Sequence, residues 1–467
     1  MNIRIGPFLA FLALALFLGF GSVWPREGFP PLLSGLGHSL LFLAVFVLFV
    51  YVLPRYFNRP MQIFWGMLLG VLAGWGLTAL GREALVTDYF GIFGTLFIQL
   101  LTMVVVPLIF ASIVSGVANI GDVRRLGGLG AKTLAYYCCT TALAVLVGLL
   151  CVNLIRPGVG QEHLEEQIAS VEEAEEEREP TLGSQIQERV LPEIIPNVNI
   201  SAVPIIPIIF SALLFGAVLA AIPNETESAL RFFQAVDKAI IQTVLWIMYL
   251  APIGVFALMG NVIATMGLEY IPMLALYVFT VIAALALHFV LLVFIVLPVL
   301  GGMSPKRFLR GMAPAIQLAF SSSSSSATLP VTMDCATRRV GASKKISSFM
   351  LPLGATINMD GTALYQAVAV LFIAQVYAVG LTLPEQFLVF LTAVVVSVGT
   401  AGIPGASVGL MSIVLASVGL PLEGIGIVIG VDRFLDMCRT LVNINGDAVG
   451  TVVVSQLEHD MGEPEPY

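Results

Sequence analysis

Apolar segments about as long as a lipid bilayer is thick recur along most of this 467-residue sequence. A helix needs about 20 apolar residues to cross the hydrocarbon core. Six membrane-spanning segments are predicted, at residues 63–80, 92–117, 133–155, 205–222, 239–259 and 271–299. Two further apolar segments precede them, at 8–20 and 40–53. We interpret the first as a retained helix and not a signal peptide, because no clear cleavage site follows it.

The composition also indicates a membrane protein. Hydrophobic residues make up 58% of the chain and charged residues 11%, whereas soluble domains are about 45–50% apolar and about 25% charged. The net charge of −8 comes largely from a polar insert at 157–199, whose glutamates cluster at 172–179. We interpret this insert as a solvated loop. Nothing in the charge pattern indicates nucleic-acid binding.

Basic residues predict the orientation of the segments. Arg124, Arg125 and Lys132 border the end of the second segment. Residues 306–310, which contain a lysine and two arginines, follow the sixth. The positive-inside rule places both groups in the cytoplasm and the acidic insert outside. Four segments lie between the two groups, and an even number of crossings returns the chain to the same side of the membrane, in agreement with this orientation.

Two later segments predict hairpins that enter the membrane without crossing it. Residues 311–340 have basic residues at both ends but are too short to cross twice. Residues 385–423 contain two short apolar runs around a Gly- and Ser-rich centre and lack basic flanks, so they are expected to enter from outside. Two hairpins from opposite faces, each followed by a long helix, predict an inverted repeat with its substrate near mid-membrane.

Two polar motifs interrupt these apolar segments. Six consecutive serines at 321–326 form the expected tip of the first hairpin, where backbone N–H groups and hydroxyls can hold a carboxylate. A low-complexity linker is the alternative. The motif Asn-Met-Asp-Gly-Thr at 358–362 predicts an unwound turn that coordinates a cation. A purely structural bond between asparagine and aspartate is the alternative.

The last apolar segment carries a polar stripe at helical spacing. Its members are Asp432, Asp436, Arg439, Thr440, Asn443 and Asp447. One ionised group at the bilayer centre costs about 2.5–3.5 kcal/mol. A single Asp–Arg pair could be structural, but four ionisable groups on one face predict a binding site.

Four motifs in this order resemble the dicarboxylate/amino acid:cation symporter family, the glutamate and aspartate transporters. They are Ser-Ser-Ala-Thr-Leu-Pro, Asn-Met-Asp-Gly-Thr, Gly-Thr-Ala-Gly-Ile-Pro-Gly-Ala and Asp-Met-Cys-Arg-Thr-Leu-Val-Asn-Ile-Asn-Gly-Asp. The resemblance covers about 60–457, apart from the insert. It implies an all-α integral membrane protein with eight core transmembrane helices and two re-entrant hairpins, in the plasma or inner membrane.

The resemblance also implies a division of the chain and a mode of action. Residues 1–59 would form about two extra helices, 60–300 the first six core helices, 301–457 the transport core and 458–467 a cytoplasmic tail. The protein would be a homotrimer within the lipid bilayer. Each protomer would take up aspartate or glutamate with sodium by an elevator-type movement, and no enzymatic activity is expected.

Roles for individual residues follow from the resemblance alone. Ser325 and Asn443 would bind the main-chain carboxylate of the substrate, Asp436 its ammonium group and Arg439 its side-chain carboxylate. The full substrate-binding set is Ser323, Ser325, Met359, Thr362, Ile403, Ala406, Asp436, Arg439, Thr440 and Asn443.

The sodium ligands that the resemblance implies fall into three groups. They are the backbone carbonyls of Gly354, Asn358 and Asn443 with the Asp447 carboxylate; the carbonyls of Thr356, Ser397, Val398 and Thr400; and Tyr137, Thr140, Thr141, Asn358 and Asp360. Many members of the family carry a second arginine in the first hairpin or just before the arginine clamp. Ser323 and Met437 occupy those positions here, so potassium counter-transport is not predicted.

Three alternatives remain at this point. An intramembrane hydrolase could use serine and aspartate, although none of the four histidines lies in a motif. A channel would need repeated rings of carbonyls, which the sequence does not indicate. Within the family, a carrier of C4-dicarboxylates or neutral amino acids is the alternative, although a dicarboxylate without an amino group would leave Asp436 unpaired.

Overall fold

The computed structural model describes residues 44–45, 47–57, 59–82, 85–124, 128–159, 205–268, 270–398, 402 and 406–462. Within these ranges the chain is helical and contains no strand. The predicted helix at 8–20, the acidic insert from residue 160 onwards, and Thr400 and Ile403 lie outside the described residues.

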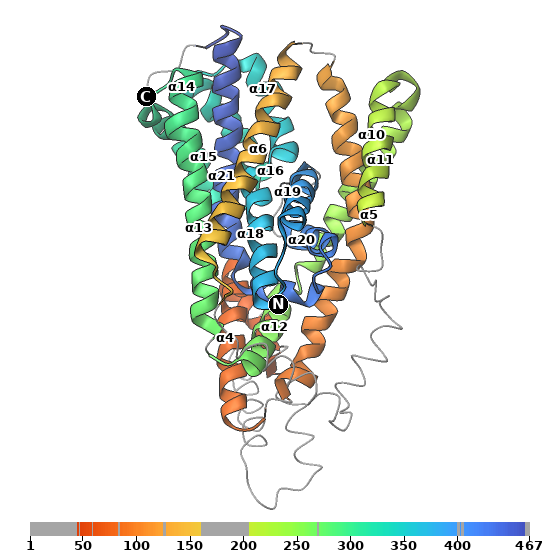
Figure 1. Ribbon diagram of the computed structural model, residues 1–467, viewed down its shortest axis with the longest axis vertical. Helices are drawn as coiled ribbons and strands as arrows, with labels where there is room; N and C mark the ends of the chain where they lie inside the picture. Colours follow the sequence, from red (N-terminus) through yellow and green to blue (C-terminus); the bar gives the residue numbers. More distant parts are fainter. Residues whose placement is uncertain are drawn as a thin grey trace, which may run out of the picture.

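The first half of the described chain forms seven long helices (Figure 1). They are α4 (Arg59–Ala79), α5 (Gly91–Arg124), α6 (Gly128–Ile155), α10 (Ile205–Ala221), α11 (Pro223–Ile247), α12 (Ala251–Met266) and α13 (Tyr270–Val290). Shorter elements are η1 (Leu48–Val52), α3 (Leu53–Tyr56), η2 (Leu85–Phe90), η5 (Leu291–Val296) and α14 (Leu297–Gly301). Five of the six predicted segments are thereby confirmed as helices.

The prediction of the fifth segment, a single span at 239–259, is wrong. The chain leaves α11 at Ile247 and starts α12 at Ala251, with a turn between them. Pro252 stands in the first turn of α12. Proline cannot donate the backbone hydrogen bond that a continuous helix needs, but it fits a helix start.

The second half forms two helical pairs and two long helical stretches. Its elements are α15 (Pro305–Ser322), α16 (Ser325–Asp334), η6 (Cys335–Val340), α17 (Lys344–Ile357), α18 (Asp360–Val376), α19 (Leu383–Val398), α20 (Ala406–Ser417), η7 (Leu422–Gly424) and α21 (Ile425–Leu457). α15 packs against α16, and α19 against α20. The two segments predicted as hairpins therefore do fold back on themselves.

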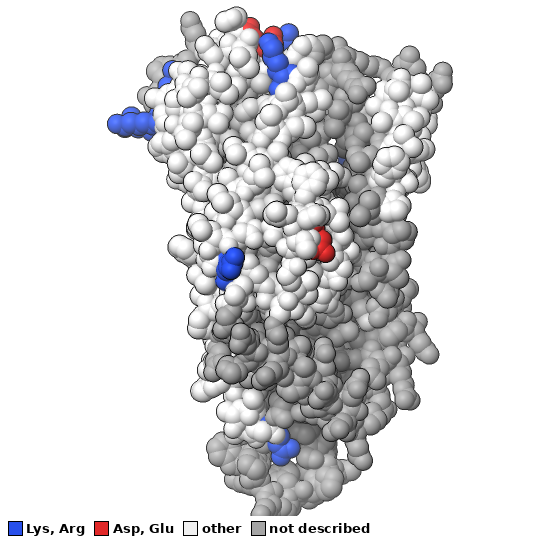
Figure 2. Space-filling model, in the orientation of Figure 1, with Lys and Arg blue, Asp and Glu red and all other residues white. Residues whose placement is uncertain are grey.

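Four helical stretches of the described chain are long and apolar enough to cross a membrane. They are Met61–Ala79, Gly128–Ile155, Tyr270–Gly301 and Lys344–Val376. Large apolar side chains such as Leu154, Phe210 and Val299 are exposed, as expected of a protein that faces lipid. Most of the described surface in Figure 2 carries no charge, and several lysine and arginine side chains lie at the end where Figure 1 places the C-terminus. The chain is a multi-pass membrane protein.

Two groups of helices are distinguished by their contacts. α4 packs against α12, and α5 against α10 and α11, whereas α6, α13, α15, α17 and α18 contact one another or α21. α21 also touches α4 and α12, so it joins the groups. α18 is the most enclosed helix, because nearly all of its side chains are buried among α6, α13, α19 and α21. The motif at 358–362, between α17 and α18, and the polar stripe on α21 thus lie at the centre.

Candidate functional site

The break between α17 and α18 lies at Asn358 and Met359. Both residues leave the helical conformation, with φ/ψ of −108°/76° and −105°/64°. Both are almost completely buried. The predicted unwinding is confirmed for these two residues, but Asp360 and Thr362 already belong to the first turn of α18. The backbone of Asn358 and Met359 therefore lies inside the protein, where a carbonyl group without a hydrogen-bond or cation partner is costly.

Two threonines of α6 face this break. The hydroxyl of Thr141 donates to Asp360 Oδ1 at 2.7 Å and to Asn358 Oδ1 at 3.2 Å. Thr140 approaches the same two oxygens at 3.4 and 3.2 Å. All four residues are buried. The structure thus brings together four of the five residues in the third predicted sodium group. The fifth, Tyr137, donates instead to the Met350 carbonyl at 2.7 Å.

His288 of α13 joins this cluster, and the sequence analysis missed it. Its Nε2 atom lies 3.2 Å from Asp360 Oδ2, and both side chains are fully buried. Nδ1 has no hydrogen-bond partner. The four histidines were set aside because none lies in a motif. The available signal was an ionisable residue inside an apolar span, which is a functional candidate by default.

Asp447 of α21 approaches the same break from the other side. Its Oδ1 accepts a 3.0 Å hydrogen bond from the Asn358 amide. Gly354 of α17 lies directly against this carboxylate, and a Cβ atom there would overlap it. Asn443, one turn before Asp447, accepts from the Gly361 N–H at 2.8 Å. The first predicted sodium group is therefore assembled around the break.

The second predicted sodium group is only partly described. Ser397 and Val398 end α19, and the Ser397 hydroxyl donates to the Val394 carbonyl at 2.8 Å. The Thr356 side chain is exposed and donates to the Leu353 carbonyl at 3.0 Å. Only backbone carbonyls were expected from this group, so these side-chain bonds neither supply nor remove a ligand. Thr400 is not described.

Arg439 is held by two aspartates of its own helix. Nη1 donates to Asp432 at 2.7 Å and Nη2 to Asp436 Oδ1 at 2.8 Å. The guanidinium lies 3.8 Å from the centroid of the Tyr365 ring, a cation–π contact. Arg439 is completely buried, and its Nε has no hydrogen-bond partner. The stripe predicted on α21 therefore contains a buried, charge-paired arginine.

A second arginine, Arg433, approaches the same cluster. Its Nη1 lies 3.6 Å from Asp436 Oδ2. The sequence analysis missed Arg433 because it lies one position off the stripe. The spacing of Arg433 and Asp436, i and i+3 on a helix, was the available signal.

Other predicted substrate residues lie between Arg439 and the break. The Asn443 amide donates to the Thr362 hydroxyl at 3.4 Å, and this hydroxyl lies 3.9 Å from Met359 Sδ. The Thr440 hydroxyl donates to the Asp436 carbonyl at 2.8 Å, within its own helix. Thr362, Thr440 and Asn443 are buried. Together they place hydroxyl and amide groups beside the charged cluster.

The serine tip meets the second helical pair. Ser323 ends α15 in the left-handed conformation with φ +51°, and its buried hydroxyl has no hydrogen-bond partner. Ser324 caps α16, accepting from the Ala327 N–H, and donates to the Gly402 carbonyl at 2.6 Å. The Ser326 N–H also donates to Gly402, at 3.2 Å. Ser325 is buried. Ala406 starts α20, but its side chain is not described.

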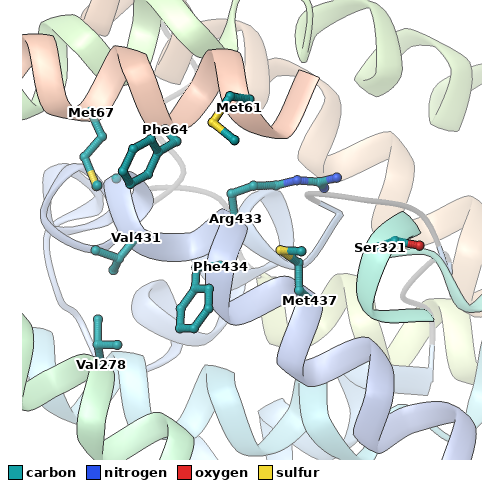
Figure 3. A pocket seen from close by; sticks show the side chains of 10 residues that line it. Met61, Phe64, Met67, Val278, Ser321, Val431, Arg433, Phe434 and Met437 are labelled. Atoms are coloured by element: carbon teal, nitrogen blue, oxygen red, sulfur yellow. The ribbon is translucent and has the colours of Figure 1, made fainter. Parts of the chain in front are cut away.

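A cavity of about 550 Å³ lies beside the charged cluster (Figure 3). It is lined by Met61, Phe64, Met67, Val278, Ser321, Gly430, Val431, Arg433, Phe434 and Met437. Arg433 is the one charged residue among these ten, and most of the wall is apolar. The cavity therefore borders the candidate site but lacks the polar groups that a charged solute would need.

The chain is similar to known transport proteins. A sequence model of the sodium:dicarboxylate symporter family matches residues 60–457. The proton/sodium-glutamate symport protein of Bacillus caldotenax is 34% identical over 415 residues, 86% of this chain and 95% of that protein. The proton/glutamate-aspartate symporter of Escherichia coli is 34% identical over 410 residues, covering 86% and 93%. Human excitatory amino acid transporter 3 is 33% identical over 416 residues, 79% of each chain.

Proposed function

Because the chain belongs to the sodium:dicarboxylate symporter family, we propose that it takes up aspartate or glutamate by symport with sodium. The observation that carries this proposal is the buried Arg439, paired with Asp436 beside the helix break. An amino acid held by its ammonium group at Asp436 directs its side chain towards Arg439. Asp432 remains bonded to Nη1 of Arg439, so once Asp436 turns to the ammonium group only an acidic side chain can replace its charge at the guanidinium. This family consists of transporters and not enzymes, so the hydrolase alternative is set aside.

Substrate binding exchanges partners within the cluster. Arg439 releases Asp436 and makes a bidentate pair with the side-chain carboxylate of the substrate. Asp436 then accepts the substrate ammonium. Ser325 at the hairpin tip and Asn443 on α21 bind the main-chain carboxylate. A C4-dicarboxylate has no ammonium group for Asp436, so this exchange favours acidic amino acids.

Sodium ions bind around the break at Asn358. Asp360, Asp447, Thr141 and the backbone of Gly354 surround this point and offer oxygen ligands, which hard cations prefer. Relatives are named for protons as well as sodium. The contact between His288 and Asp360 supports a role for protons in driving transport, at the same break between α17 and α18.

We propose that the described helices belong to eight core transmembrane helices and two re-entrant hairpins in an inverted repeat, with about two further helices before residue 60. The protomers form a trimer, and α4, α5 and α10–α12 act as its fixed scaffold. The pairs α15–α16 and α19–α20, which are the two proposed hairpins, together with α17–α18 and α21 form the moving part between residues 301 and 457.

The proposed fixed and moving helices lie at different depths along the membrane normal, which supports the elevator movement. By the positive-inside rule, α4 begins and α21 ends at the cytoplasmic side. Arg433 lies 24 residues before Leu457, or about 36 Å along a straight helix. It nevertheless shares a cavity with Met61, in the first turn of α4. The α21 group therefore extends far beyond α4 towards the cytoplasm, as Figure 1 shows for these two helices.

Substitution of Arg439 tests this function. Arg439→Thr removes both the attraction for an acidic side chain and the penalty for a neutral one. We expect the variant in proteoliposomes to lose aspartate and glutamate uptake and to gain serine or alanine uptake. Arg338→Thr, which changes an exposed arginine, is the control. A folded Arg439→Thr protein that still prefers aspartate would show that Arg439 has only a structural role.

A further inference from the structure

Asp436 has an arginine at each of its two carboxylate oxygens. Oδ1 accepts from Arg439 Nη2 at 2.8 Å, and Oδ2 lies 3.6 Å from Arg433 Nη1. The Asp436 side chain is only 10% exposed, and that of Arg433 only 15%. The two arginines therefore do not compete for the same oxygen.

In the described structure, few polar groups apart from the Asp436 carboxylate lie near the Arg433 side chain. Its side chain extends along the apolar cavity beneath Met61 of α4, with Phe434 and Met437 nearby (Figure 3). Its Nε atom has no hydrogen-bond partner. A mostly buried guanidinium in apolar surroundings is stabilised chiefly by a nearby carboxylate. Asp436 is the carboxylate to which Arg433 forms its ion pair.

The charges of the cluster balance only when Arg433 is included. Asp432 and Asp436 contribute two negative charges, and Arg433 and Arg439 two positive charges. An acidic amino acid adds a net negative charge. Without Arg433 the substrate would meet a cluster that is itself negative, at a depth where charges are weakly screened.

We propose that Arg433 is a positioning residue for substrate recognition, acting through Asp436. This inference rests on the proposed function. When Arg439 turns to the substrate side chain, Oδ1 of Asp436 becomes available to the substrate ammonium, while Oδ2 keeps its ion pair with Arg433. Arg433 thereby fixes the orientation of the Asp436 carboxylate and leaves the occupied cluster with one net negative charge where it would otherwise carry two.

The test is uptake of aspartate by the full chain in proteoliposomes under a sodium gradient. Arg433→Gln removes the charge, and Arg433→Met does so with a side chain that suits the apolar cavity. We expect both to raise KM by about tenfold or more with Vmax within about threefold, because the lost interaction acts on substrate binding. Arg433→Lys keeps the charge and should bring KM to within about threefold of wild type. Arg338→Gln removes an exposed arginine of an i,i+4 pair with Asp334 and should leave KM unchanged.

Each other outcome contradicts the inference. An unchanged KM in Arg433→Gln and Arg433→Met, with wild-type uptake intact, overturns the role of Arg433 and leaves the proposed function standing. A lower Vmax with unchanged KM, failure of Arg433→Lys to restore KM, or recovery of both neutral variants only as aggregates shows a purely structural role. Absence of acidic amino-acid uptake in the wild type overturns the proposed function, and the inference with it.

Discussion

The Asn358 amide donates a 3.0 Å hydrogen bond to the Asp447 carboxylate, and this bond joins the break between α17 and α18 to α21. The break carries the motif Asn-Met-Asp-Gly-Thr, and α21 carries the polar stripe. Because Gly354 has no side chain, the backbone of α17 can lie directly against the same carboxylate. A change at Asp447 is therefore expected to act on both the ion sites and the substrate site.

Asp447→Asn tests this link. The variant keeps the size of the side chain but loses the charge that attracts a cation. We expect the sodium concentration for half-maximal uptake to rise about tenfold and the aspartate KM to rise with it, since the coupling between two bound ligands is reciprocal. Uptake measured over a matrix of sodium and aspartate concentrations gives both values. Asp334→Asn, at an exposed position, serves as the control, and an unaltered sodium dependence in Asp447→Asn would remove Asp447 from the ion site.

Asp436→Asn tests the ammonium site. Arg439 retains Asp432 as a partner at 2.7 Å, and asparagine still offers Arg433 an oxygen, so the protein is expected to fold. Loss of one partner of a buried charged pair costs about 3–5 kcal/mol, enough to abolish measurable aspartate binding. Isothermal titration of the purified protein with aspartate in sodium buffer measures this. Wild-type affinity in the variant would place the ammonium group elsewhere.

His288→Gln tests the proton contribution. Glutamine can still donate a hydrogen bond to Asp360 but, unlike an imidazole, it cannot take up a proton. We expect sodium-driven uptake to persist, while the stimulation by an inward proton gradient at fixed sodium is lost. His459→Gln, at an exposed histidine, is the matched control. A pH profile identical to that of the wild type would make His288 a structural partner of Asp360 only.

Gly402→Ala tests the contact between the two helical pairs. A Cβ atom at Gly402 would lie 2.7 Å from Ser326 Oγ and 2.9 Å from the Ala355 carbonyl, too close for any side chain. We expect the substrate KM to rise by about tenfold, because a serine tip that is displaced by less than 1 Å no longer fits the bound carboxylate. Gly380→Ala, where no atom lies within 4 Å, should behave as wild type. Equal KM values for the two variants would show that the tip contact does not shape the site.

The sequence predicted those features that depend on spacing along one helix. The polar stripe on α21 followed from helical periodicity, and the break at Asn358 followed from polar residues and a glycine inside an apolar run. The paired helices around the serine tip followed from segment length and basic flanks. The first two features depend on residues within a few positions of one another, and the third on the charges at the two ends of one segment, 311–340.

Contacts between distant segments were predicted only where the family resemblance supplied them, as for Thr140 and Thr141 with Asn358 and Asp360; the others were missed. His288 and Asp360 are 72 residues apart, and no motif connects α13 to the break. Arg433 was overlooked because it lies one position off the stripe, although its guanidinium approaches Asp436, about one turn further along the helix. The span at 239–259 was misread because hydrophobicity alone conceals a turn before Pro252. Only the packing of the helices decides which partner each buried charge finds.

The central claim is that an ion gradient drives accumulation of an acidic amino acid. Purified protein in liposomes, loaded with sodium-free buffer and diluted into sodium buffer with labelled aspartate, tests it most directly. The account predicts accumulation above the external concentration, followed by release when gramicidin dissipates the sodium gradient. Full accumulation in choline buffer under a proton gradient alone, or equilibration without accumulation in sodium, would contradict it.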